Sequence, residues 1–209
     1  MRLFEIYPDL EPLTAGSSYS QLFNFLYSLA LLRYFTKDHA NKVNSKLGTK
    51  KKIAQLCELD YLNCKNSQVY TITEKTRKLL DEQGFNCKIL AKKLTGEGND
   101  HDLKITDYIL DERCNPWFYS VIYPFFDYLI PDACLIYKNE STYKITFLEV
   151  ENPKAGWDDY LENKKSNYKR LASDYDVYGK WWKVWSERLN IPYCTEEEFC
   201  FNVVYVKGE

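Results

Sequence analysis

The chain has 209 residues, of which 45% are hydrophobic and 16% aromatic, and this is enough apolar material for the packed core of one domain or two small ones. Its apolar runs stay well short of the roughly 20 residues that a membrane helix needs, so we expect a soluble protein with no membrane partner. Seven cysteines occur without a Cys-x-x-Cys pair. This pattern disfavours a zinc site and, without a signal peptide, favours a reducing cytoplasm.

The charge is divided unevenly along the chain. Residues 33–93 carry 14 Lys or Arg and 6 Asp or Glu, a net charge of +8. Because the whole chain has a net charge of −2, the remaining residues carry a net charge of −10. A basic block suits an anionic partner such as a phosphate backbone. We therefore expect two functional units, residues 1–94 and 95–209, with a boundary where Gly96 and Gly98 interrupt the pattern.

The basic block is mostly helical by pattern. Apolar residues at three- and four-residue steps predict an amphipathic helix over residues 18–35, after an irregular N-terminal arm. Thr36 can cap a short second helix that ends near Gly48. Thr49 can cap a third helix, and the consecutive Lys50, Lys51 and Lys52 then fall in its first turn.

A hairpin and a fourth helix follow. Residues 61–62 are a short apolar segment and residues 68–72 are a predicted strand, with the polar turn 63–67 between them. Residues 73–83 predict a helix that stops at Gly84. The order helix, helix, helix, hairpin, helix resembles a winged helix-turn-helix. That resemblance implies that residues 49–59 form the recognition helix and that Lys65 lies at the wing tip, with these lysines facing DNA. A solvated lysine face, or a winged helix that binds protein, are the alternatives.

The second half begins with a predicted helix over residues 101–110 and a run of aromatic residues. Two predicted strands, 131–136 and 143–151, then form a hairpin around the polar turn 138–141. Antiparallel pairing would bring Asp132, Glu149 and Glu151 to one end of a sheet, where three carboxylates repel one another unless a cation is present. A usual alternative is that acidic residues at strand ends simply face solvent.

The chain after this hairpin predicts two further features. A helix over residues 158–172 places Lys164 and Tyr168 one turn apart, so both could cover the carboxylates. The last third of the chain contains four tryptophans and a predicted strand, residues 199–206. We expect the tryptophans to pack a helix on the sheet and the strand to be buried; stacking of tryptophans on nucleic-acid bases is the less favoured alternative.

Pro131-Asp132, Glu149 and the Lys164-x-x-x-Tyr168 pattern resemble the PD-(D/E)XK nuclease superfamily. The resemblance implies that carboxylates bind Mg²⁺ or Mn²⁺ and that a lysine or tyrosine acts beside them. In this chain Glu151 occupies the usual lysine position, and some members supply the lysine from the following helix, as Lys164 could. The family also uses an acidic residue from a preceding helix, for which Asp107 and Glu112 are the candidates.

The whole plan is similar to the replication-relaxation family of mobile-element proteins, over residues 20–170. The expected fold class is α+β, with an N-terminal winged helix-turn-helix joined to a C-terminal PD-(D/E)XK-nuclease-like domain that has a central mixed sheet. The resemblance implies a DNA-binding protein of a plasmid or mobile element, a Mg²⁺-dependent DNA endonuclease. The alternative is a non-catalytic DNA-binding regulator with a degenerate nuclease fold. Winged-helix proteins often pair, so a homodimer is a further expectation.

Overall fold

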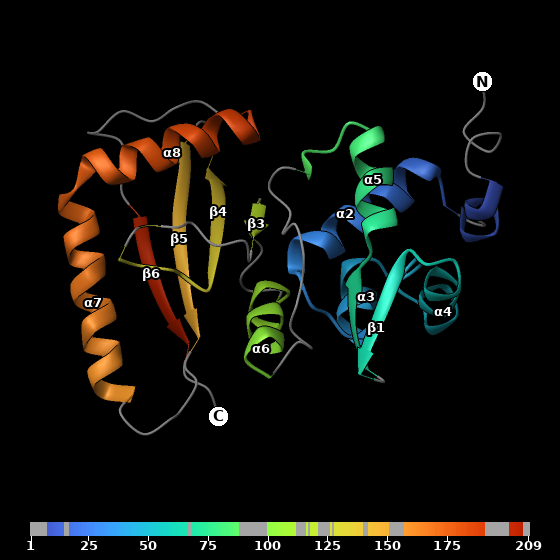
Figure 1. Cartoon of the computed structure of the whole chain (residues 1–209), viewed down its shortest axis with the longest axis horizontal. Coiled ribbons are helices and arrows are strands. Elements are labelled where there is room, and N and C mark those ends of the chain that lie inside the picture. Colours follow the sequence, from blue (N-terminus) through green and yellow to red (C-terminus); the bar gives the residue numbers. More distant parts are fainter. Residues whose placement is uncertain are drawn as a thin grey trace. The chain divides into compact units, whose positions relative to one another are not determined.

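The computed structural model describes residues 8–14, 17–66, 68–87, 100–111, 116, 118–120, 126, 128–139, 142–150, 157–190 and 201–206. The chain is a mixed α+β protein that divides into two compact units, Met1–Leu110 and Asp111–Glu209 (Figure 1). The expected boundary after residue 94 falls in a segment, residues 88–99, outside the described ranges.

The first unit is built on three helices whose starts the sequence marks clearly. They are α2 (Tyr19–Leu32), α3 (Lys37–Val43) and α4 (Lys50–Glu58). Ser18, Thr36 and Thr49 are their N-caps, as expected from residues that accept a backbone hydrogen bond in the first turn. The turn between α3 and α4 needs Gly48, because a Cβ there would overlap the backbone of Ala40.

A hairpin follows, made of β1 (Leu62–Asn66) and β2 (Val69–Ile72), and helix α5 (Glu74–Glu82) comes after it. Phe35 adds an isolated bridge to Tyr70, which ties the α2–α3 junction to the hairpin. The predicted turn over residues 63–67 was wrong, because β1 runs through these residues to Asn66. The strand register shifts between Cys64 and Asn66, so Lys65 sits at a bulge in a strand.

Helix α6 (Asp100–Ile109) is held to the first unit by polar contacts. The hydroxyl of Thr106 donates to the carbonyl of Tyr34 at 2.8 Å, and the Nε2 atom of buried His39 lies 2.8 Å from the Asp107 carboxylate. The Nδ1 atom of His39 accepts the backbone N–H of Thr36, so Nε2 carries the proton and donates to Asp107. Asp107 is thereby engaged in joining α3 to α6.

The short segment η1 (Pro8–Thr14), a 3₁₀ helix, packs against α2 and is bonded to Lys52 of α4 and Lys75 of α5. Its residues Leu10 and Leu13 are fully buried. The carboxylate of Asp9 accepts from the hydroxyl of Tyr61 at 2.9 Å and pairs with the ammonium of Lys75 at 3.0 Å. The N-terminal arm is thus an ordered part of the first unit over these residues, and it is anchored by both apolar and charged contacts.

The second unit has a four-stranded sheet in the order β3-β4-β5-β6. Its strands are β3 (Phe118–Ser120), β4 (Ala133–Asn139), β5 (Thr142–Val150) and β6 (Phe201–Val206). The first three strands pair antiparallel, and β6 pairs parallel to β5, so the sheet is mixed. Parallel pairing requires a crossover connection, which two helices provide.

Those helices are α7 (Trp157–Ser173) and α8 (Tyr175–Leu189), which lie beside the sheet in Figure 1. Phe147 of β5 is fully buried, and its ring lies 5.9 Å from that of Tyr168 and 5.5 Å from that of Trp181. Both helices therefore cover the face of β5 that carries Phe147. Trp181, Trp182 and Trp185 are buried in this core, which confirms packing as their role.

Strand β6 departs from its prediction. Its residues are half-buried or exposed, because β6 has β5 as its one neighbour in the described sheet and lies at an edge. A run of apolar residues does not distinguish a central strand from such an edge. None of the helices that the structure describes is long and apolar enough to cross a membrane.

The Asp9 contacts predict a specific stability effect. Partial burial alone would raise the pKa of Asp9, but the hydrogen bonds from Lys75 and Tyr61 and the Lys75 charge lower it below its usual 3.8. Asp9→Asn should therefore cost about 1 kcal/mol of unfolding free energy near neutral pH. The cost should vanish well below pH 3.8, where the wild-type carboxyl is protonated in both states.

Urea unfolding of the two proteins at several pH values measures this difference. Glu11→Gln, at an exposed position of the same segment, is the matched control and should change stability little. An Asp9→Asn penalty that stayed constant down to acid pH would contradict the ionic explanation.

Candidate functional site

Two carboxylates meet at one end of the β4–β5 pair. Ala133 lies opposite Leu148 in the register, and the pairing continues outward, because the Asp132 N–H donates to the Leu148 carbonyl at 3.0 Å. The Asp132 carboxylate in turn accepts the N–H of Val150 at 2.8 Å. Pro131, which has no N–H to offer a ladder, precedes this last pair. Asp132 is therefore held by the backbone on both sides of Glu149.

Glu149 is buried, with 4% of its surface exposed, on the same side of β5 as Phe147. Helix α7 supplies its partners from one helical face. The hydroxyl of Tyr168 donates to Oε1 of Glu149 at 2.6 Å, and the ammonium of Lys164 pairs with Oε2. Lys164 also donates to the Ile130 carbonyl at 3.2 Å, next to the start of β4. The lysine thus links α7 to both strands that carry the carboxylates.

The electrostatics of this cluster follow from burial. Burial raises the pKa of Glu149 to about 7, although the ammonium of Lys164 pulls in the opposite direction; the nearby charge of Asp132 raises it further. Burial opposes the charged form of Lys164, yet Glu149 and Asp132 together raise its pKa above the ordinary value. Burial and the Glu149 charge raise the pKa of Tyr168, so its hydroxyl stays a donor.

The structure brings together four of the five residues predicted for this site: Asp132, Glu149, Lys164 and Tyr168. Glu151, the predicted third metal ligand, lies outside the described residues, as does Glu112. Among the described residues, no group of three or more His, Cys, Asp or Glu side chains is arranged to hold a metal ion. The site within the described ranges is therefore a buried carboxylate, its half-buried neighbour, an ammonium and a phenol.

Two residues near the site were not predicted. Tyr160 is one turn before Lys164, and the lysine ammonium lies 5.4 Å from the centre of its ring. Tyr205 lies opposite Glu149 in the β5–β6 register. The four-residue spacing of Tyr160, Lys164 and Tyr168 was a signal that could have revealed the first. The second depended on the parallel pairing of β6, which the sequence does not specify.

The lysines predicted to contact DNA differ in their surroundings. Lys50 and Lys51 are exposed at the start of α4, and Lys65 is half-buried in β1. Lys52 is different, because its ammonium donates to the Leu13 carbonyl of η1 at 2.7 Å. This contact gives Lys52 a structural role that the pattern of three lysines does not reveal.

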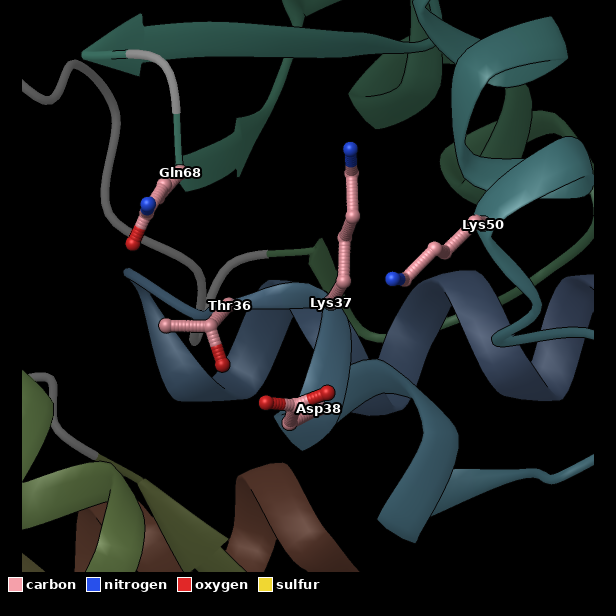
Figure 2. Close-up of a pocket in the computed structure, with 5 residues that line it drawn as sticks. All are labelled: Thr36, Lys37, Asp38, Lys50 and Gln68. Carbon is pink, nitrogen blue, oxygen red and sulfur yellow. The ribbon is translucent and has the colours of Figure 1, made fainter.

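A pocket of about 380 Å³ lies beside these lysines. Thr36, Lys37 and Asp38 line it from the start of α3, Lys50 from the start of α4 and Gln68 from the hairpin. Figure 2 shows Lys50 pointing toward Lys37 across this space. Lys37 also lies 5.6 Å from the centre of the Tyr70 ring, and the Tyr70 hydroxyl raises the pKa of Lys37. Two lysine side chains therefore line one hollow of the first unit.

Comparison of the chain with protein-family models, with curated proteins and with solved structures finds no match.

The Lys164–Glu149 pair predicts a large and pH-dependent stability effect. Lys164→Met leaves a buried carboxylate without its counter-charge, which should cost about 3–5 kcal/mol at a pH above 8. The cost should shrink near pH 5, because Glu149 can then be neutralised by a proton in the folded state. The double variant Lys164→Met, Glu149→Gln should recover most of the loss.

Urea unfolding at both pH values measures these costs. Lys165→Met is the matched control, since Lys165 forms an exposed pair with Glu162 at 2.7 Å on the same helix and should contribute about 0.5 kcal/mol or less. Equal losses of unfolding free energy in Lys164→Met and Lys165→Met would show that the buried pair stabilises the fold no more than the exposed one.

Proposed function

We propose that this protein binds DNA through its first unit and hydrolyses phosphodiester bonds through its second, as a metal-dependent endonuclease of a plasmid or mobile element. The observation that carries the proposal is the buried Glu149 carboxylate with Lys164 and Tyr168 bonded to it and Asp132 beside it. Burying an acid with an ammonium is costly, and such arrangements are concentrated at functional sites.

The first unit supports the DNA-binding half of the proposal. Its element order, three helices, a hairpin and a fourth helix from α2 to α5, supports the proposal because it is the order expected of a winged helix-turn-helix. In that arrangement α4 is the helix that enters the major groove, and its first turn presents exposed Lys50 and Lys51. The pocket that Lys50 lines offers one further ammonium donor to a phosphate, that of Lys37.

The carboxylates suit a hard divalent cation. Asp132 and Glu149 provide oxygen ligands, which Mg²⁺ and Mn²⁺ prefer, and Glu149 already has a cation at its oxygen in the form of the Lys164 ammonium. Mg²⁺ or Mn²⁺ would be held by these two residues. When bound, the ion would polarise a phosphodiester and lower the pKa of a bound water.

The remaining residues have roles that their contacts define. Lys164, once it leaves Glu149, carries a positive charge at the mouth of the site that can stabilise a phosphate in the transition state. Tyr168 stays protonated and donates to Glu149, so it orients the carboxylate. Asp132 is fixed by the Val150 N–H and cannot swing away from the end of β5 without losing that bond.

A non-catalytic DNA-binding regulator is the second candidate. It is favoured by the pairing of Glu149 with Lys164 and Tyr168, because both carboxylate oxygens already accept a hydrogen bond. In this alternative the cluster stabilises the second unit and binds no metal. Glu151, in place of the usual lysine, agrees with it.

Cleavage distinguishes the two candidates. The wild-type protein should nick supercoiled plasmid with Mg²⁺ or Mn²⁺, and Glu149→Ala should slow nicking by a factor of about 100 or more. Glu149→Gln, which keeps the shape of the side chain, should be equally impaired. Duplex binding that is retained by all three proteins, with no nicking by any of them, would support the regulator.

The lysines of α4 predict a separate effect on duplex binding. Lys50→Ala and Lys51→Ala should each weaken binding to any duplex sequence and reduce the slope of log K against log salt by about 1. Lys52→Ala should instead lower the unfolding free energy, because its ammonium bonds to Leu13. Electrophoretic mobility shifts at several salt concentrations measure the slopes, and unchanged slopes in the first two variants would contradict DNA binding through α4.

A further inference from the structure

Exposed aromatic and aliphatic side chains gather at the mouth of the Glu149 site. Among the described residues, the exposed large hydrophobic side chains are Ile130, Tyr160, Val184 and Tyr205. Three of these four flank Lys164. Its ammonium bonds to the carbonyl of Ile130 and lies 5.4 Å from the centre of the Tyr160 ring. Exposed rings beside a buried ionic cluster are unusual for a surface that meets water alone.

Tyr205 completes the group from the strand side. It pairs with Glu149 in the register of β5 and β6, and its ring lies 6.5 Å from that of Tyr168 at an angle of 88°. The charges of Glu149 and Lys164 both act on its hydroxyl, with burial the largest influence in raising its pKa. Yet 38% of Tyr205 and 48% of Tyr160 is exposed. Two tyrosine rings thus border the Lys164–Glu149 pair, Tyr160 of α7 beside the ammonium and Tyr205 of β6 opposite Glu149.

We propose that this rim binds unpaired nucleotides, and that the substrate of the site is single-stranded DNA or the unpaired part of a duplex. The inference rests on the proposed nuclease function and adds the substrate class. In a duplex the faces of the bases are covered by their neighbours, so exposed rings can stack only on bases that have left the helix. Stacking on Tyr160 and Tyr205 would hold the adjoining phosphate near Asp132 and Glu149.

The charges along α7 favour a nucleic acid over an apolar peptide. Lys169 and Arg170 follow Lys164 and are exposed and positively charged, whereas Lys165 is paired with Glu162. The guanidinium of Arg170 lies 4.0 Å from the centre of the Tyr128 ring, a combination that accepts both a phosphate and a base. Asp158 and Asp159 occupy the first turn instead. The strand is therefore expected to leave the site toward the C-terminal half of α7.

Photocrosslinking tests the location of the bases. A short oligodeoxynucleotide that contains iododeoxyuridine should be irradiated with the full chain in EDTA, and the adduct mapped by mass spectrometry. The expected adduct is on Tyr160 or Tyr205, and a fully paired duplex with the same label should give none there. Adducts confined to the first unit, or equal adducts with the duplex, would overturn the proposal.

Affinity tests the contribution of the rings. Fluorescence anisotropy should show a labelled oligodeoxythymidine binding roughly 5- to 100-fold more tightly than an abasic strand of equal charge. Tyr160→Ala and Tyr205→Ala should reduce this preference, whereas Tyr160→Phe and Tyr205→Phe should keep it. Val184→Ala removes an equally exposed apolar side chain from α8 and is the matched control. Equal affinity for both strands would indicate that the rim binds something other than bases.

These outcomes separate the inference from the proposed function. Plasmid nicking together with equal binding of normal and abasic strands would support the nuclease function and contradict the preference for unpaired nucleotides. Base-dependent crosslinks without any cleavage would keep the rim as a nucleotide-binding surface and remove the nuclease.

Discussion

The second unit depends on a carboxylate that is placed inside a sheet. Glu149 is almost fully removed from water, and an isolated charge in that position would be very unfavourable. The chain compensates by aligning Lys164 and Tyr168 on one face of α7, so the rotation and height of this helix are set by the need to reach both oxygens of Glu149. The same residues that stabilise the fold are then available for chemistry.

In the first unit, too, residues of similar type have different roles. Of the three consecutive lysines in α4, two remain exposed and one is used to bond the N-terminal 3₁₀ segment. The histidine of α3 likewise joins α3 to α6 through Asp107. In the proposed reading the basic unit holds duplex DNA, while the acidic unit offers carboxylates and aromatic rings to a strand that has been opened. The division of charge in the sequence agrees with this separation of roles.

Much of this structure follows from local sequence signals, and the exceptions have physical reasons. The caps Thr36 and Thr49 predicted the starts of α3 and α4, because capping depends only on a few adjacent residues. The pairing of β4 with β5 followed from a short turn between two apolar runs. The exposure of β6 and the bulge at Lys65 did not follow from local sequence signals, because a strand's neighbours and a bulge depend on contacts distant in sequence.

The candidate site was predictable to the same extent. Asp132 and Glu149 were placed together by the hairpin, and Lys164 and Tyr168 by helical spacing. The tie between Lys52 and Leu13 could not be foreseen, because it joins residues far apart along the chain. Asp107 was considered for the nuclease site on the strength of the family pattern alone, yet its carboxylate bonds to His39 of the first unit.

The parallel pairing of β6 with β5 has a consequence for biosynthesis. Tyr205 reaches its place beside Glu149 through a strand that emerges from the ribosome only after α7 and α8. A growing chain can close the hairpin and bring α7 over it, but this edge of β5 stays unpaired until β6 has been synthesised. Tyr205 therefore joins Tyr160 and Glu149 only in the step that pairs β6 with β5.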